Sequence, residues 1–214
     1  MITVDIEGVI MAYRNKFFLS FDYNSDVHYY WLMRAWRQDD ETKFNFYNTH
    51  DMNMSNNTNL ELPIRQVLKN QLLQTKAFVI LVGEKTRYLQ YVHWEIEEAL
   101  ELHLPIICVN LNGFRHRDPI RCPSIISERL SVHINFDAVV LQHALETWPT
   151  RHNNLKQQGY SSPYYYTQND YVRLGLGPSA RDEQIQRRTK EEKGFLKKVP
   201  RWRSRLRLHN TEKL

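Results

Sequence analysis

The sequence predicts an α/β domain with a five-stranded parallel sheet flanked by helices, followed by a basic C-terminal extension. Short apolar runs alternate with stretches of helical spacing, the order expected of parallel strands joined by crossover helices. Two runs, residues 77–82 and 106–111, are almost unbroken in apolar residues, as strands buried on both faces should be. The 214 residues are 42% hydrophobic with only 7 Gly and 8 Pro, which argues for a real core and against disorder or a many-turned all-β chain.

The predicted strands are the five short apolar runs, at residues 17–21, 44–47, 77–82, 106–111 and 132–136. Segments with helical spacing separate or follow them, at residues 26–38, 60–72, 92–100 and 138–145. The first of these segments is apolar on several sides, which predicts a well-buried helix. Pro105 ends the third. Residues 160–171 are rich in Tyr and Ser, and we expect an irregular stretch there, packed on the outside of the core.

Three parts are predicted along the chain: a domain over residues 15–145, an irregular Tyr-rich extension packed on it over 146–180, and a basic tail over 181–214. The tail contains 12 Lys and Arg against 5 Asp and Glu, whereas residues 1–180 contain 17 against 19. The tail therefore has a net charge of +7 and the rest of the chain −2, so the positive net charge of +5 comes from the tail. A basic tail can bind nucleic acid, anionic lipid or an acidic partner, and a solvated helix of mixed charges is the plainer alternative.

Composition also limits the compartment. Cys108 and Cys122 are too few for a disulfide framework or a four-cysteine zinc site, and free thiols in a reducing cytosol are expected. No apolar run approaches the roughly 18–20 residues that cross a bilayer. The first residues carry acids where a signal peptide needs positive charge. We therefore expect a cytoplasmic protein without a membrane partner.

The predicted topology suggests where a ligand binds. Doubly wound sheets bind ligands at the carboxyl ends of the strands, where the strand order reverses. With the common order 2-1-3-4-5, that crevice lies between the first and third strands, where the loops over residues 20–26 and 83–91 meet. The second loop leads into a helix that bears Glu95 on the flank of its buried face, while Glu97, Glu98 and Glu101 face water. Glu95 is thus either a boundary residue that caps a neighbour or a functional carboxylate.

Other common sites are missing from the sequence. It has no glycine-rich phosphate loop and no His-Glu-x-x-His element, which argues against a P-loop enzyme, an ordinary dehydrogenase and a zinc protease. Its histidines are scattered. We therefore expect neither a metal site nor a bound cofactor.

Two stretches resemble TIR domains. Residues 16–22 (KFFLSFD) are similar to the F-[IL]-S-[YF] first strand of that family. Residues 75–113 follow its pattern V-L-[IV]-G-x-x-T, then W-V-x-x-E-I, then A-L-E-x-x-x-P-I-I, with Tyr91 in place of the Trp. The resemblance covers roughly residues 15–140 and is closest to the TIR-like branch of bacterial Thoeris anti-phage systems. It implies a flavodoxin-like fold, in agreement with the topology above.

The resemblance also implies an activity. Catalytic TIR domains cleave the bond between nicotinamide and ribose in NAD+, here a substrate and not a cofactor, and Glu95 stands at the position of their catalytic glutamate. In Thoeris systems the ADP-ribosyl product, cyclised or conjugated, is a diffusible signal that activates a separate effector protein. A phage-derived activator and a homo-oligomer are compatible with this implication. The expected substrate-binding residues are Phe18, Ser20, Phe21, Asp22, Tyr23, Lys85, Arg87 and Tyr91, with Lys85 or Arg87 at the pyrophosphate.

Two other functions stay open at this point. Many TIR domains are interaction modules, so a noncatalytic signalling scaffold is the main alternative. A scaffold has no need of a carboxylate at position 95, which favours catalysis. Nucleic-acid recognition through the tail arginines is a third, less favoured reading, and phosphate contacts of that kind would weaken steeply with salt. The arginines concerned are Arg201, Arg203, Arg205 and Arg207.

Overall fold

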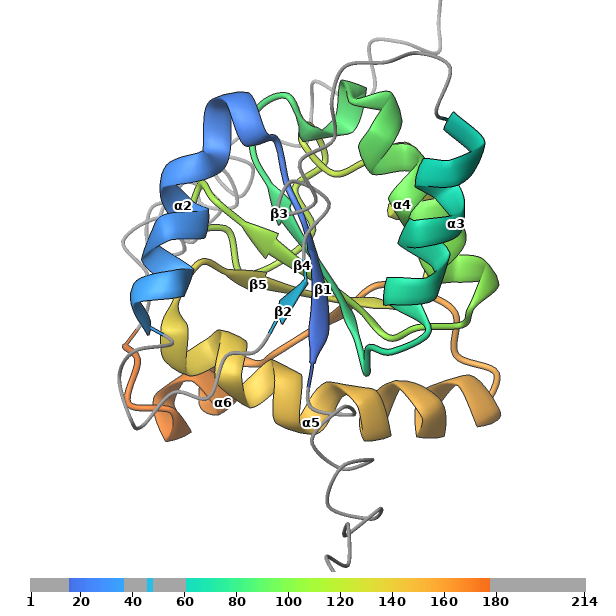
Figure 1. The fold of residues 1–214 in the computed structure, drawn as a ribbon. Coiled ribbons are helices and arrows are strands. Elements are labelled where there is room, and N and C mark those ends of the chain that lie inside the picture. The colour runs from blue at the N-terminus through green and yellow to red at the C-terminus, as the bar shows by residue number, and fades with distance from the viewer. Residues whose placement is uncertain (1–15, 37–45, 48–60, 178–214) are drawn as a thin grey trace, which may run out of the picture. The chain divides into compact units, whose positions relative to one another are not determined.

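The structure is a computed structural model that describes residues 16–36, 46–47 and 61–177. Its centre is a sheet of parallel strands in the order β2-β1-β3-β4-β5-β6 (Figure 1). This is the predicted 2-1-3-4-5 order with one further strand at the edge. The strands are β1 (Phe17–Ser20), β2 (Phe46–Tyr47), β3 (Phe78–Val82), β4 (Ile106–Asn110), β5 (Ser131–Asn135) and β6 (Tyr164–Tyr165).

Helices connect the strands and cover both faces of the sheet. Figure 1 shows α3 and α4 together on one side, with α2 and α5 elsewhere around the sheet. No described helix is long and apolar enough to cross a membrane. The helices are α2 (Tyr23–Trp36), α3 (Glu61–Leu72), α4 (Gln90–Glu101), α5 (Ala138–Gln157) and α6 (Gln168–Arg173), with 3-10 turns η3 (Thr86–Tyr88) and η4 (Ser124–Ile126).

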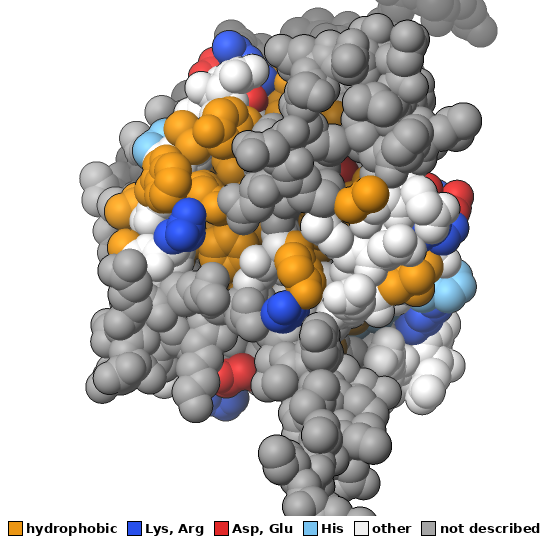
Figure 2. All heavy atoms as spheres, in the orientation of Figure 1, with side chains coloured by type: hydrophobic (Ala, Val, Ile, Leu, Met, Phe, Trp, Pro, Cys, Tyr) orange, Lys and Arg blue, Asp and Glu red, His pale blue; other side chains and the backbone are white. Residues whose placement is uncertain are grey.

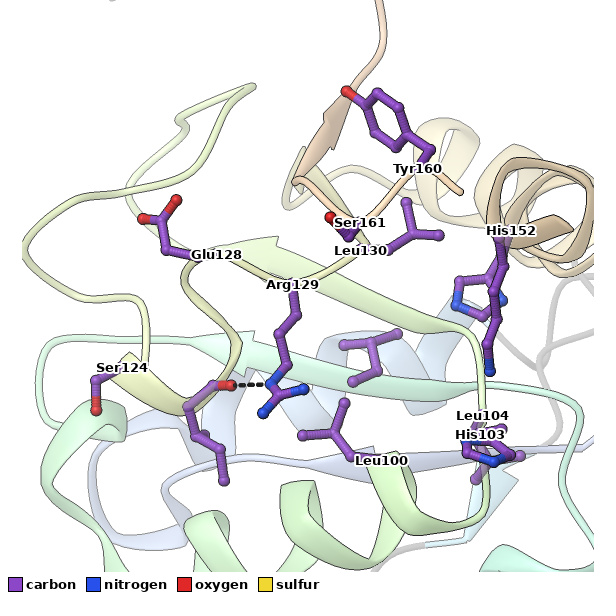
Figure 3. A pocket seen from close by; sticks show the side chains of 13 residues that line it. Leu100, His103, Leu104, Ser124, Glu128, Arg129, Leu130, His152, Tyr160 and Ser161 are labelled. Carbon is purple, nitrogen blue, oxygen red and sulfur yellow. Dashed lines mark hydrogen bonds between the residues drawn. The ribbon is translucent and has the colours of Figure 1, made fainter. Parts of the chain in front are cut away.

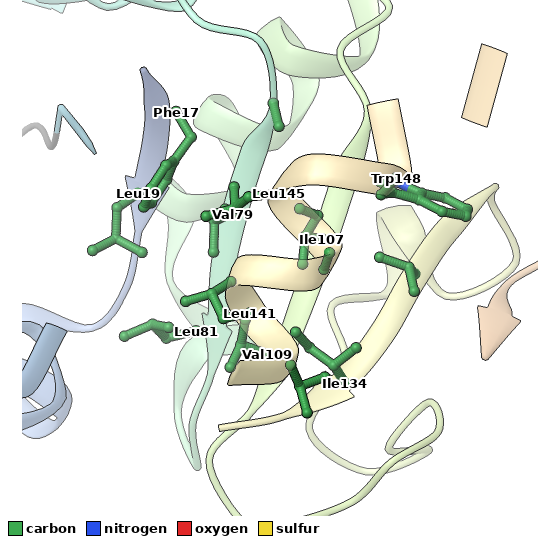
Figure 4. Packing of buried hydrophobic residues seen from close by; sticks show 14 of the residues in the cluster. Phe17, Leu19, Val79, Leu81, Ile107, Val109, Ile134, Leu141, Leu145 and Trp148 are labelled. Atoms are coloured by element: carbon green, nitrogen blue, oxygen red, sulfur yellow. The ribbon is translucent and has the colours of Figure 1, made fainter. Parts of the chain in front are cut away.

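Each face of the sheet has its own hydrophobic core, because alternate strand residues point to opposite sides. Val79 and Ile107 belong to the cluster that contains residues of α2 and α5 (Figure 4). Phe78 and Cys108 belong to the cluster under α3 and α4. The central strands β3 and β4 are buried along their whole length. This explains why the unbroken apolar runs identified them in the sequence.

The region after β5 is more regular than its sequence predicts. Helix α5 continues to Gln157, well past residue 145, and β6 pairs in parallel with β5. The stretch over 160–171 is irregular at 160–163 and 166–167, as predicted, but it also contains β6 and the start of α6, and its residues Tyr166 and Tyr171 are part of the core. A two-residue strand and a six-residue helix are too short to produce a detectable period.

Helix α2 is less buried than predicted. It begins at Tyr23, and its buried residues are Asp26, Tyr30 and Met33. Trp31 and Leu32 are exposed, and Figure 2 shows hydrophobic side chains gathered over this helix. Its apolar residues on several sides therefore reflect an apolar outer surface and not complete burial.

Several predictions lie outside the described residues. These are residue 15 of the predicted domain, residues 44–45 of the second strand, residues 37–38 and residue 60 at the ends of two predicted helices, residues 178–180 of the extension, and the whole basic tail over 181–214.

Candidate active site

The first wall of the site is the junction of β1 and α2. Asp22 precedes the helix, and its Oδ1 accepts a hydrogen bond from the backbone N–H of Asn24 at 3.0 Å. A short acceptor side chain here satisfies one of the helix's unpaired N–H groups. Asp26 follows one turn later. Both carboxylates are buried, at 2% and 6% exposed. Buried acids are costly unless their surroundings compensate, so this junction is chemically unusual.

The second wall is the loop after β3. Gly83 packs against the carboxyl group of Asp26 so closely that a Cβ on Gly83 would lie 2.1 Å from Oδ2. The buried hydroxyl of Thr86 accepts a hydrogen bond from the Gly83 N–H at 2.9 Å and donates one to the Leu81 carbonyl at 3.2 Å. The Gly and Thr of the G-x-x-T motif therefore have separate tasks. The glycine admits the acid, and the threonine fixes the loop that leads into α4.

The third wall is helix α4. The hydroxyl of Tyr91 donates to the carbonyl of Phe21 at 3.3 Å, which ties the start of α4 to the end of β1. Glu95 lies one turn further along on the same side of the helix, since residues i and i+4 are neighbours. Glu95 is only 3% exposed. The glutamate singled out in the sequence is thus more deeply buried than a flank position predicts.

The site is strongly negative. Burial raises the pKa of Asp26 from 3.8 to about 6, and the charge of Asp22 adds to the rise. Burial likewise raises the pKa of Tyr91 above its usual value, with further contributions from Asp22 and Glu95. Three carboxylates therefore act on the space around the Tyr91 hydroxyl. Within the described part of the chain, no group of His, Cys, Asp and Glu is arranged to hold a metal ion.

The structure separates the predicted substrate-binding residues into two groups. Asp22, Tyr91 and Glu95 lie close enough to interact electrostatically. Ser20 is the last residue of β1, beside β3 at the switch point, and its Oγ is buried with no hydrogen-bond partner among the described residues. Tyr23 begins α2 and is 44% exposed.

Phe18 and Phe21 belong to the cores instead. Phe18 is fully buried and stacks on Phe78, with ring centroids 5.7 Å apart. Phe21 stacks on Tyr30 at 5.4 Å. Only the backbone carbonyl of Phe21 takes part in the site, as the acceptor for Tyr91. The structure therefore does not support ring contacts from Phe18 or Phe21 to a substrate.

The two predicted cations differ. Lys85 is exposed in the loop after β3. The guanidinium of Arg87 donates to the backbone carbonyl of Ile120, and its carbon lies 5.3 Å from the Tyr88 ring centroid. His93 Nε2 lies 2.8 Å from the Arg87 carbonyl and links this turn to α4. Arg87 therefore joins two loops at the rim of the site.

Two charged residues of the site were not predicted as functional. Asp26 ends the loop over residues 20–26 that was predicted to meet the crevice, and it begins the predicted helix, but no role was predicted for its carboxylate. None was predicted for Arg121, whose charge lowers the pKa of Asp26. The G-x-x-T motif was the one signal for Asp26, because a glycine at a strand end suggests a close neighbour. Arg121 follows a long loop after β4, and no pattern in the sequence announces its approach.

The other glutamates of α4 are not all alike. Glu97 and Glu101 are exposed, as predicted. Glu98 is only partly exposed and forms an ion pair with Lys69 of α3 at 3.7 Å. The prediction that Glu98 simply faces water is wrong, because α3 packs beside this part of α4.

The arrangement of strands and helices is consistent with a TIR-like fold. Residues 18–116 match the family described as "Thoeris protein ThsB, TIR-like domain". The match covers a little under half of the chain and includes all the predicted site residues. No curated protein matches the sequence.

Two solved structures resemble the chain at low identity. One contains the TIR domains of the activated Roq1 resistosome, which directly recognizes the pathogen effector XopQ, with 14% identity over 47% of this chain and a TM-score of 0.35. The chain spans 59% of that protein's length. The other is a conserved protein from Enterococcus faecalis V583, with 12% identity, coverage of 75% and 96%, and a TM-score of 0.39. Similarity at this level says nothing about activity.

Proposed function

We propose that this TIR-like domain cleaves NAD+ between nicotinamide and ribose and forms an ADP-ribose-derived signal, cyclic or conjugated, that activates a separate effector in anti-phage defence. The observation that carries the proposal is the buried carboxylate of Glu95 at the switch point. It lies on the helix that follows Gly83 and Thr86, as the TIR motif requires. A residue with only a structural role at that position has no need of a charge.

The chemistry suits a single carboxylate. In NAD+ the nicotinamide is a cationic leaving group, and the electrons of the broken C1′–N bond neutralise its ring, so no strong general acid is required. The barrier lies in the ribosyl cation, as in glycoside hydrolysis. A carboxylate held in a site of low dielectric stabilises that cation and accepts hydrogen bonds from the ribose hydroxyls. The nearby charges of Asp22 and Asp26 act in the same direction.

The second half of the reaction needs an acceptor. A nucleophile attacks C1′, forms the new bond and gives up a proton, which a carboxylate of the site can accept. The deep burial of Glu95, Asp22 and Ser20 favours an acceptor within the substrate or a bound molecule over bulk water. Tyr23, which is exposed at the start of α2, can stack on a ring. Lys85 or Arg87 can approach the pyrophosphate, and Arg121 is a further cation near Asp26.

A noncatalytic scaffold is the second candidate. The observation that favours it is the outer surface of α2, where Trp31 is 54% and Leu32 is 47% exposed. Exposed apolar side chains that lie together can form a protein interface. This surface is compatible with catalysis too, so only the chemistry separates the two functions.

The decisive experiment is Glu95→Gln. The amide keeps the size of the side chain and removes the charge, so cleavage should fall by roughly 10²–10³, or about 3–4 kcal/mol of barrier. Nicotinamide release and ADP-ribosyl products are measured on NAD+, with a phage trigger if the parent is silent.

Glu97→Gln and Glu101→Gln are the matched controls, since both residues lie on the same helix and are exposed. Each should stay within a few-fold of the parent. Glu98→Gln is unsuitable as a control because it also breaks the ion pair with Lys69. If the triggered parent and Glu95→Gln both leave NAD+ intact while phage defence survives in each, the scaffold is the correct function.

A further inference from the structure

A second cleft lies at the opposite end of the sheet from Glu95. This open cleft, of about 710 Å³, is lined by the end of α4, the start of β4, the loop before β5 and the last turns of α5 (Figure 3). This volume is within the range of small-molecule sites. Its apolar lining consists of Leu100, Leu104, Ile106, Ile125 and Leu130.

The polar lining of the cleft carries a positive charge. Arg129 and Lys156 line it together with His103 and His152. Figure 3 shows Arg129 among the lining residues, and its Nε donates to the Ile125 carbonyl at 2.9 Å, which fixes the side chain. Because this bond uses Nε alone, the guanidinium can still present its outer N–H groups to a ligand.

The one acid in the lining does not cancel this charge. Glu128 Oε1 lies 3.3 Å from Arg117 Nη1, and Arg117 is not part of the cleft. Glu128 is also largely exposed. Among the described lining residues, the cleft therefore combines an apolar floor with cations that no acid of the lining pairs with.

The backbone at the rim is strained. His103 has φ of 56°, a left-handed conformation that glycine usually occupies after a helix. Its N–H donates to Leu100, and the next N–H, that of Leu104, donates to Ala99, which closes the end of α4. A glycine would end the helix with less strain, and strain of this kind concentrates at functional sites. Because this position is His103 and not glycine, an imidazole lies beside the cleft.

We propose that this cleft binds a small organic anion, a molecule with an apolar or planar body and one phosphate or carboxylate group. The body would lie on the leucines and isoleucines of the floor, with the exposed ring of Tyr160 at the edge. The anionic group would lie between Lys156 and Arg129, because these supply charged donors from two different elements. This site is independent of the chemistry at Glu95.

Binding should depend on pH through His152. Its burial lowers its pKa below 6.5, and the charges of Lys156 and His103 lower it further. The other ionisable lining residues are Lys156 on α5, His103 after α4, and Arg129 and Glu128 in the loop before β5. A bound anion stabilises the protonated imidazole, so anion binding should raise the pKa of His152.

Calorimetric titration of the full chain with AMP and, separately, with octanoate tests the proposal. We expect one of the two to bind, which also shows whether the anion is a phosphate on a planar body or a carboxylate on an alkyl chain. Lys156→Gln and Arg129→Gln should each weaken binding about tenfold, the usual effect of losing one charged hydrogen bond. Arg173→Gln, an exposed cation outside the cleft, should leave the affinity unchanged.

Two results would overturn the proposal. One is the absence of binding by both probes at millimolar concentration. The other is binding that Glu95→Gln alters and Lys156→Gln does not, since this would place the anion at the other end of the sheet.

Discussion

At the scale of single residues, Asp26 has the most unusual environment in the site. It sits in the first turn of α2, where a carboxylate is normally solvated and stabilised by the helix dipole. Here Gly83 and the rest of the β3 loop bury it, and Oδ2 has no hydrogen-bond partner among the described residues. Its pKa of about 6 means that the folded protein keeps this proton up to about pH 6 and has lost most of it at pH 7.

This pKa predicts a stability cost that can be measured. Between pH 3.8 and about 6 the folded state binds more protons at Asp26 than the unfolded chain, so the parent loses stability as the pH rises through this window. Asp26→Asn removes the effect. The free energy of unfolding of the variant, relative to that of the parent, should therefore rise by up to about 2–3 kcal/mol from pH 4 to pH 7.5. Urea unfolding of both proteins at both pH values measures this change.

Glu97→Gln is the control for Asp26→Asn, since it removes one exposed carboxylate and should show no such pH-dependent difference. Equal stability differences for Asp26→Asn at pH 4 and pH 7.5 would contradict the raised pKa. Under the proposed function, the stabilised Asn variant should also cleave NAD+ more slowly, because active sites trade stability for reactive charges.

The residues show how far sequence reasoning reaches. Glu95 could be found because helical spacing and a motif both marked its position. Asp26 could not, because its burial depends on a loop 57 residues further along the chain. Phe18 and Phe21 lie in the correct strand or just after it, but sequence alone does not show that each ring already has an aromatic partner in the core.

At the scale of elements, the contact between α2 and the end of β3 positions the site. A Cβ at Gly83 would lie 2.1 Å from Asp26 Oδ2 and 2.7 Å from its Cγ. Since Asp26 is buried, its side chain has little room to move aside. Gly83→Ala should therefore destabilise the protein by about 1–3 kcal/mol, as overpacking does.

A double-mutant cycle tests the cause. Asp26→Ala removes the atoms that an added Cβ meets, so Gly83→Ala should cost much less in that background. Urea unfolding of the parent, both single variants and the double variant gives the coupling energy. An undiminished cost in the Asp26→Ala background would mean that the backbone at Gly83, and not the contact with the acid, requires glycine.

The elements were predictable where their patterns were long. The buried strands β3 and β4 and the helices between strands follow from apolar runs and spacing. The strand β6 and the helix α6 could not be predicted in this way, because β6 contains only two residues and α6 only six. The conformation of these two short elements is fixed by tertiary contacts, such as the burial of Tyr171, and by the capping box of Thr167 with Asp170.

At the scale of the whole molecule, the described fold is closed by contacts near its C-terminal end. The guanidinium of Arg115 lies 3.9 Å from the centroid of the Tyr171 ring, and its Nη2 donates to the Gly177 carbonyl at 2.7 Å. These contacts link the loop after β4 to α6 and the residues that follow it. All the candidate site residues precede this point.

Removal of residues 181–214 should therefore leave the fold and the proposed NAD+ cleavage within a few-fold of the full chain. It takes away 12 Lys and Arg with 5 Asp and Glu, so the net charge changes from +5 to −2. Any salt-sensitive binding of nucleic acid should fall sharply with it, because such binding depends on cations that neutralise phosphates.

Circular dichroism, nicotinamide release and titration with a DNA oligonucleotide at two salt concentrations measure these three properties on one truncated protein. Retained activity with lost oligonucleotide binding would assign the tail to partners and not to catalysis. Lost activity in a truncation that still folds would contradict the prediction, and would mean that the tail completes the site at Glu95 or an assembly that the reaction requires.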